Sequence, residues 1–242
     1  MNSSGNKILI TGGATGIGLG MAARFLQEGN TVLICGRRQS ALDEAARQHP
    51  GLITRVCDLA REDGRFDLYE WIATEHPDLN VLVNNAGIQQ WMKVGDLDFY
   101  ERSKLELSTN VEAPLHLTAL LLQLPSLTTI LNVTSGLAFT PLAQAPVYSA
   151  TKAFFRSFTL SLRHQLKGRG IEVIEVIPPA LNTDLGGKGL HDEYPPVSDF
   201  IESIFAQLKE GKQELTFGFS EAMRNAGPEQ LKAAFARMNP GN

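Results

Sequence analysis

The chain has 242 residues, of which 43% are hydrophobic and 20% charged, a size and balance that allow a large buried core. A formal net charge of -4, with the basic residues scattered, excludes the one-sided positive surface that nucleic-acid binding requires. No apolar run approaches the ~20 residues of a membrane helix, and Cys35 and Cys57, without a Cys/His cluster, exclude a disulfide framework and a zinc site. We therefore expect a cytoplasmic protein that binds no nucleic acid, no membrane and no metal.

Short β-branched and leucine-rich runs alternate with amphipathic stretches of helical length, a pattern typical of repeated strand-helix-strand units. The predicted strands are, in chain order, Lys7–Thr11, Thr31–Cys35, Leu52–Cys57, Val81–Asn84, Thr128–Val133, Glu172–Ile177 and Glu214–Phe217. The predicted helices are Ile17–Glu28, Ser40–Gln48, Phe66–Glu75, Phe99–Leu124, Val147–Lys167 and Val197–Lys209. Because most strands are apolar throughout, we expect them to be buried on both faces.

This alternation predicts the α/β class: a single-domain Rossmann fold, with a doubly wound parallel sheet of about seven strands and helices on both faces. The domain is expected to span residues 1–242. The segment from Pro178 to Pro196 is rich in proline and glycine and has little periodicity, so it is predicted to be a long loop. Long loops inside a compact domain are often lids, and we expect a substrate lid at about residues 178–197.

A glycine-rich turn follows the first predicted strand and precedes an apolar-periodic helix. It reads Thr11-Gly12-Gly13-Ala14-Thr15-Gly16-Ile17-Gly18. Gly12 permits a tight turn, Gly16 lets the backbone approach a pyrophosphate, and Gly18 permits close packing of the helix on the strand. Free N–H groups at the helix N-terminus favour an anion there. On its own, the turn is also compatible with a plain strand-to-helix connection.

The second predicted strand ends Ile34-Cys35-Gly36-Arg37-Arg38. An NAD-specific site usually carries an acid at this point, which binds the ribose 2′-OH, and Gly36 stands in its place. Arg37 and Arg38 can pair with a 2′-phosphate instead, although either arginine can also be a solvated surface residue. We therefore predict NADP(H) in preference to NAD(H), with Arg37 making the stronger contact.

Tyr148 and Lys152 are four residues apart at the start of a predicted helix, which places both side chains on one helical face. A nearby cation stabilises a phenolate and lowers the phenol pKa, so that the phenol can exchange a proton near neutral pH. Ser135 follows the strand ending at Val133, at the carboxyl edge where ligands bind in open α/β sheets. Its hydroxyl can donate to a substrate oxygen as negative charge grows there.

Taken together, these residues resemble the short-chain dehydrogenase/reductase family over almost the whole chain. The resemblance rests on Thr11-Gly12-x-x-x-Gly16-x-Gly18, Asn84-Asn85-Ala86-Gly87, Asn110, Ser135, Tyr148-x-x-x-Lys152 and residues 178–183, which occur in the family's order and at about its spacing. Narrower strings, including Ile34-Cys35-Gly36-Arg37 and Asn85-Ala86-Gly87-Ile88-Gln89, resemble a bacterial oxidoreductase subset named for D-alanine esterification of teichoic acids. That name implies a genomic neighbourhood more than a chemistry.

The resemblance implies a catalytic role for four residues. Tyr148 would be the general acid in reduction and the general base in oxidation, and Lys152 would lower its pKa and hold the nicotinamide ribose. Ser135 would orient the carbonyl, and Asn110 would help to place a water chain behind Lys152.

The resemblance also implies a set of cofactor contacts. Asp58 and Leu59 would flank the adenine, and Thr183 would reach the nicotinamide amide. The full predicted cofactor set is Gly12, Thr15, Gly16, Ile17, Gly18, Arg37, Arg38, Asp58, Leu59, Asn85, Ala86, Gly87, Tyr148, Lys152 and Thr183. The family usually has Pro-Gly where this chain has Pro178-Pro179, and because proline has no N–H, the chain departs from the family's pattern at the start of the Thr183 loop.

The expected partners are a small-molecule carbonyl or alcohol substrate and further copies of the chain. Leu137, Phe139, Gln144 and Trp91 lie near the expected hydride path and are predicted to contact the substrate. The helices 99–124 and 147–167 carry apolar residues around much of their circumference. The resemblance implies that they pair across a two-fold axis, which gives a homodimer or homotetramer.

The predicted function is thus an NADP(H)-dependent oxidoreductase that transfers a hydride to or from a carbonyl or secondary alcohol by a Ser/Tyr/Lys mechanism. One alternative is a catalytically silent NAD(P)-sensing regulator of the same fold. Such a protein should lack at least one of Ser135, Tyr148 and Lys152, and all three are present. A second alternative is an epimerase or dehydratase, but those chains usually carry a separate substrate region for which this chain has little room.

Overall fold

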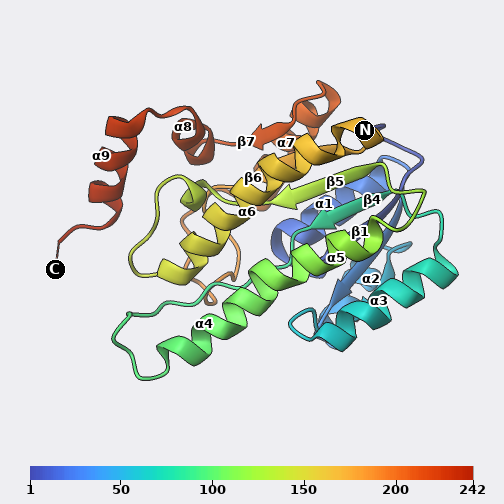
Figure 1. The fold of residues 1–242 in the computed structure, drawn as a ribbon, viewed down its shortest axis with the longest axis horizontal. Helices are drawn as coiled ribbons and strands as arrows, with labels where there is room; N and C mark the ends of the chain where they lie inside the picture. Colours follow the sequence, from blue (N-terminus) through green and yellow to red (C-terminus); the bar gives the residue numbers. More distant parts are fainter. Residues whose placement is uncertain (242) are drawn as a thin grey trace.

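The computed structural model describes residues 1–241, which form a sheet of seven strands with helices on both sides (Figure 1). The strands are β1 (Lys7–Thr11), β2 (Thr31–Gly36), β3 (Ile53–Val56), β4 (Val81–Asn84), β5 (Thr129–Val133), β6 (Glu172–Ile177) and β7 (Glu214–Thr216). Their order in the sheet is β3-β2-β1-β4-β5-β6-β7, and each neighbouring pair is parallel. The predicted parallel sheet of seven strands is confirmed.

The helices also follow the predicted order, with three differences. The longer helices are α1 (Gly16–Gln27), α2 (Gln39–Gln48), α3 (Glu62–Glu75), α4 (Phe99–Leu107), α5 (Ala113–Leu121), α6 (Pro146–Leu166), α7 (Val197–Lys209), α8 (Phe219–Asn225) and α9 (Pro228–Met238), and the short ones are η1 (Ser108–Glu112), η2 (Gly136–Ala138) and η3 (Lys167–Arg169). Within residues 1–241, no helix combines the length and the apolar character needed to span a membrane.

The three differences have local causes. Helix α3 begins four residues earlier than predicted, because its polar first turn, with Glu62 and Asp63, has no apolar period to mark it but carries the acidic residues that favour a helix N-terminus. The predicted helix 99–124 contains the wider turn η1 between α4 and α5. Helices α8 and α9 were not predicted: α9 buries Ala234 while its other residues stay at least partly exposed, so its apolar pattern is weak.

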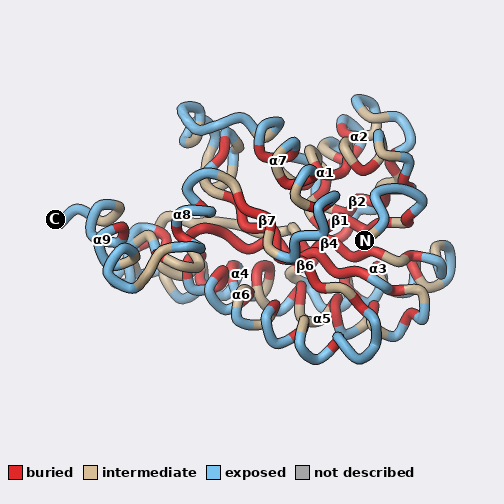
Figure 2. The backbone as a smooth tube through the Cα atoms, turned by 90° about the horizontal axis from the view of Figure 1, so that it is seen from above, coloured by how far each residue is buried: buried red, intermediate tan, exposed pale blue. Residues whose placement is uncertain are grey.

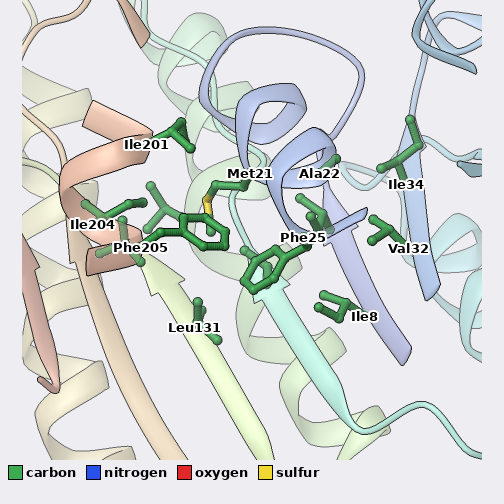
Figure 3. Close-up of a cluster of buried hydrophobic side chains, with 14 of the residues drawn as sticks. Ile8, Met21, Ala22, Phe25, Val32, Ile34, Leu131, Ile201, Ile204 and Phe205 are labelled. Atoms are coloured by element: carbon green, nitrogen blue, oxygen red, sulfur yellow. The ribbon is translucent and has the colours of Figure 1, made fainter. Parts of the chain in front are cut away.

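Each strand sends alternate side chains to opposite faces of the sheet, and two hydrophobic cores result. Ile8 and Ile10 of β1 belong to the core formed with α1, α2 and α7, whereas Leu9 belongs to the core formed with α3, α5 and α6. Figure 2 shows these helices on the two sides of the sheet. Figure 3 shows the first core, where the rings of Phe25 and Phe205 lie 4.6 Å apart between centroids.

The strand order reverses between β1 and β4, and this point of the sheet is where ligands bind in doubly wound folds. Hydrogen bonds join the two strand ends. The Thr11 hydroxyl accepts from the backbone N–H of Asn85 at 2.9 Å and of Ala86 at 3.0 Å, and it donates to the Val83 carbonyl at 3.2 Å. The segment that follows β4 is therefore fixed beside the glycine-rich turn that follows β1.

Candidate active site

A cleft of about 740 Å³ opens at the carboxyl edge of the sheet. The glycine-rich turn, the ends of β2 and β3, the segment after β4, the first turns of α6 and the segment 182–186 line it. All fifteen predicted cofactor residues line this one cleft: Gly12, Thr15, Gly16, Ile17, Gly18, Arg37, Arg38, Asp58, Leu59, Asn85, Ala86, Gly87, Tyr148, Lys152 and Thr183. Residues separated by up to 171 positions, from Gly12 to Thr183, thus meet at one site.

The glycine-rich turn depends on two glycines for its shape. Gly12 has a φ of 63°, which a side chain rarely permits. A Cβ at Gly18 would lie 2.3 Å from the Gly12 carbonyl oxygen, so α1 can approach the turn only without a side chain there. Helix α1 starts at Gly16 without a side-chain cap from Thr15. The first N–H groups of α1 therefore remain available to an anion in the cleft.

The end of β2 presents two exposed arginines to the same cleft. Arg37 and Arg38 line it beside Gly36. Neither guanidinium forms a hydrogen bond or an ion pair with any residue between 1 and 241, whereas Arg47 on α2 is paired with Glu44. The positive charge at this end of the cleft is thus not neutralised by the described part of the chain. A bound anion can therefore pair with it.

Ser135, Tyr148 and Lys152 lie together at the other end of the site, and each side chain is buried. Ser135 follows β5 and caps η2, where its Oγ accepts from the Leu137 N–H at 3.1 Å. On α6, the Lys152 Nζ donates to the Val133 carbonyl at 2.9 Å and lies 5.6 Å from the centroid of the Tyr148 ring. The structure thus brings the end of β5 and the start of α6 to one place.

Burial dominates the electrostatics of Tyr148 and Lys152. It raises the pKa of the Tyr148 phenol above its usual value, although the nearby Ser135 hydroxyl acts in the opposite direction, and the Glu106 carboxylate adds to the rise. Burial also lowers the pKa of Lys152 to about 8. The lowering of the Tyr148 pKa by Lys152 therefore stays a prediction. The lysine ammonium is directed at a backbone carbonyl, and the loss of hydration penalises the phenolate.

Asn110 lies in η1, behind the cleft wall. Its Oδ1 accepts from the Ile88 N–H at 2.9 Å, and its Nδ2 donates to the Ile88 carbonyl at 2.8 Å and to the Thr151 hydroxyl at 3.2 Å. A Cβ at Gly87 would lie 3.4 Å from Asn110 Oδ1 and 3.7 Å from Lys152 Nζ. Wider helical turns are frequent at functional sites, and here the turn brings an amide next to the lysine.

None of the four predicted substrate residues is part of the lining of the 740 Å³ cleft. The Trp91 Nε1 donates to the Gly186 carbonyl at 3.1 Å, and the Phe139 ring lies under the Arg156 guanidinium at 4.3 Å from its centroid. Leu137 is half-buried in η2, and the Gln144 carbonyl accepts from the N–H of Met92 at 3.0 Å. Their contact with a substrate stays a prediction.

Sequence reasoning missed several lining residues. They are Ala14, Ala41, Cys57, Ala60, Ile88, Thr109, Val133 and Thr134, whereas the lining residues Asn182, Asp184, Leu185 and Gly186 fall within the predicted lid. Most of them adjoin a motif residue along the chain, so proximity in sequence was the available signal. Glu106 was missed as well, because a glutamate inside a helix is ordinarily solvent-exposed, whereas this one is buried.

Comparison with known proteins gives a clear family assignment. A family model described as short chain dehydrogenase matches residues 6–193. The chain belongs to this family. The oxidoreductase DltE of Bacillus subtilis (strain 168), itself described as uncharacterized, is 45% identical over 99% of this chain and 98% of its own length. This likeness confirms the resemblance to the bacterial subset that the sequence strings indicated.

Two further comparisons bear on the family and on the fold. The NADP-dependent 3-hydroxy acid dehydrogenase YdfG of Escherichia coli (strain K12) is 30% identical over 71% of each chain. A short chain dehydrogenase from Burkholderia cenocepacia J2315, crystallised in complex with NADP, superposes with a TM-score of 0.83 at 23% identity, covering 97% of this chain and 99% of that one. The fold of this oxidoreductase is thus the fold of its family.

Proposed function

We propose that this oxidoreductase transfers a hydride between NADP(H) and a carbonyl or secondary alcohol carbon, with Ser135, Tyr148 and Lys152 as catalytic residues. The observation that carries the proposal is that Tyr148 and Lys152 line one end of a cleft, with the buried Ser135 hydroxyl beside Tyr148 behind the cleft lining. The glycine-rich turn and Arg37 stand at its other end. YdfG, whose name states that it is NADP-dependent and acts on 3-hydroxy acids, supports both the cofactor and the reaction class.

Each catalytic side chain has a role that follows from its chemistry. The Ser135 hydroxyl donates a hydrogen bond to the substrate oxygen as negative charge grows on it. In reduction, the Tyr148 hydroxyl gives its proton to that oxygen, and in oxidation the phenolate takes a proton from the alcohol. The Lys152 ammonium stabilises the phenolate and holds the nicotinamide ribose. A bound nicotinamide would supply the hydride in reduction and accept it in oxidation, and the hydride and the Tyr148 proton together would convert the carbonyl to the alcohol.

The residues present fit a dinucleotide. The uncapped start of α1 offers N–H groups to a pyrophosphate. Gly16 faces Thr183 across the cleft, and a Cβ at Gly16 would lie 3.5 Å from Thr183 Cγ2 and narrow the cleft there. Arg37, without a partner in residues 1–241, stands where a 2′-phosphate is expected.

The proposed function is tested with a panel of aldehydes, ketones, quinones and secondary alcohols, read by NADPH absorbance. We expect turnover with at least one member of the panel. Cofactor binding without any turnover would instead favour the silent sensing protein of the same fold. NAD(H) retained tightly through purification would favour an epimerase or dehydratase.

We further propose that residues 1–242 form one dinucleotide-binding domain and that residues 178–197 act as its substrate lid. Trp91 supports the lid, because its Nε1 hydrogen bond to the Gly186 carbonyl joins this segment to the segment after β4. Loss of one hydrogen bond of ~1 kcal/mol in Trp91→Phe is expected to raise the substrate KM roughly fivefold, with less effect on cofactor affinity. Trp71→Phe on α3 is the matched control. Equal KM values for Trp91→Phe and the wild type would count against the lid.

We propose that the chain assembles as a homodimer or homotetramer through α4 and α6. Both helices expose large apolar side chains, among them Leu105, Leu107, Phe154 and Leu160, each at least 42% exposed. Covering them removes apolar surface from water. Light scattering at micromolar concentration is expected to give two or four times the chain mass of 26.4 kDa. Phe154→Asp should weaken assembly, and Ser40→Asp, on the exposed side of α2 across the sheet, should not. A wild-type mass of one chain would refute the proposal.

A further inference from the structure

Glu106 is a buried carboxylate that none of the roles described above uses. It lies near the end of α4 with a relative exposure of 0%. Its Oε1 accepts a 2.6 Å hydrogen bond from the backbone N–H of Gln90, and its Oε2 accepts none from any residue between 1 and 241. A buried charge is costly unless its contacts repay the lost hydration. Such a residue is therefore a candidate for a functional role.

Glu106 is the middle member of three residues, each four apart, that hold one extended segment. Asn110 bonds both backbone groups of Ile88, and Glu106 bonds the Gln90 N–H. One turn before Glu106, Arg102 donates from Nε to the Gln90 Oε1 at 3.2 Å and from Nη2 to the Trp91 carbonyl at 2.5 Å. The side chains at 102, 106 and 110 thus fix the backbone from Ile88 to Trp91.

That extended segment connects the cofactor end of the cleft with residues 182–186. Ile88 and Gln89 line the cleft, and the Trp91 indole bonds the Gly186 carbonyl. Asn110 also bonds Thr151, the residue before Lys152. A shift of the segment 88–91 would therefore move the wall of the cleft and its contact with the 178–197 segment together.

We propose that Glu106 is a positioning residue of the site: it fixes the segment 88–91 through Gln90 and, because α4 packs against α6, it places a carboxylate charge beside the helix that carries Tyr148. This inference rests on the proposed function, because it assigns Glu106 to the reaction of Tyr148. The charged and titratable groups that face Glu106 are Arg102 on its own helix and Tyr148 on α6, with Lys152 beside Tyr148.

The charge on Glu106 bears on proton transfer. Burial raises its pKa to about 7, against the Gln90 hydrogen bond and the Arg102 charge, which lower it. Above that pH, Glu106 carries a negative charge that raises the Tyr148 pKa. Alcohol oxidation needs the phenolate. Removing the charge therefore lowers the Tyr148 pKa, and the acid limb of the oxidation profile should move to lower pH.

Two substitutions separate the hydrogen bond from the charge. Glu106→Gln keeps an acceptor for the Gln90 N–H and removes the charge, while Glu106→Met fills a similar volume and removes both. The matched control is Glu101→Gln, which alters an exposed glutamate on the same helix. Hydrogen exchange of the Gln90 amide, followed by NMR, reports on the contact without any need for turnover.

In Glu106→Met, the Gln90 amide is expected to exchange about 10- to 100-fold faster than in the wild type, because its buried acceptor is lost. The substrate for the kinetic measurement is the alcohol of the panel that the wild type oxidises fastest. In Glu106→Met, its kcat/KM should fall roughly 10- to 100-fold, because the cleft wall is misplaced. In Glu106→Gln, exchange and kcat/KM should stay near wild type, while the acid limb moves to lower pH. Glu101→Gln should change none of these.

Three results would overturn the inference: unchanged Gln90 exchange in Glu106→Met, faster exchange with unchanged kcat/KM, or an unshifted oxidation profile in Glu106→Gln. Failure of the proposed function gives a different pattern. In that case the wild type turns over no member of the panel, and the Gln90 exchange rates alone decide whether Glu106 holds the segment.

Discussion

Tyr148→Phe is expected to reduce kcat for carbonyl reduction by about 10² to 10⁴ while leaving cofactor affinity nearly unchanged. The substitution removes only the hydroxyl that gives the proton, and the remaining ring fills the same buried space. The Lys152 Nζ keeps its bond to the Val133 carbonyl, so the lysine is not released from its position. Single-turnover rates with NADPH and NADPH titrations measure the two effects separately.

Lys152→Ala provides the contrast to this variant. The lysine is proposed both to stabilise the phenolate and to hold the nicotinamide ribose, so its loss should lower turnover and weaken cofactor binding together. The Tyr148 pKa is already raised by burial, and without the ammonium the phenolate becomes harder still to form. Wild-type turnover in Tyr148→Phe would show that the assigned acid is wrong.

The second large effect concerns the cofactor. NADPH and NADH differ only by a 2′-phosphate, and a charge-assisted contact from Arg37 is worth about 1.5 to 3 kcal/mol, or roughly 10- to 150-fold in affinity. We therefore expect a strong NADPH preference in the wild type, measured as kcat/KM, and a weaker one in Arg37→Ala. Arg38→Ala should have a smaller effect. Arg47→Ala, whose guanidinium is paired with Glu44, serves as the control.

Gly36→Asp is expected to reverse the preference or nearly so. An aspartate there can accept from a free ribose 2′-OH and repels a 2′-phosphate. The site has room for it, because a Cβ at Gly36 would have Leu42 Cδ2, at 3.9 Å, as its nearest neighbour. If the wild type has the same kcat/KM with NADH as with NADPH, Arg37 and Arg38 merely face solvent.

The sequence by itself determined the fold class and which residues would meet in one cleft. Apolar runs of strand length that alternate with amphipathic stretches of helical length predicted seven strands, because a strand buried on both faces is apolar throughout and a helix that covers a sheet is apolar on one side. The motif residues, from Gly12 to Thr183, were identified without a structure. They share one cleft because the carboxyl ends of parallel strands meet at one edge.

Only the tertiary structure decided the properties that depend on surroundings. The direction of the Tyr148 pKa follows from burial and from Glu106 on another helix, and no local pattern encodes either. The burial of Glu106, its contact with Gln90 and the bond from Trp91 to Gly186 join segments up to 95 residues apart. Side-chain spacing specifies which face of a helix a residue occupies. What covers that face, and therefore whether a charge there is hydrated, is fixed only when the other elements pack against it.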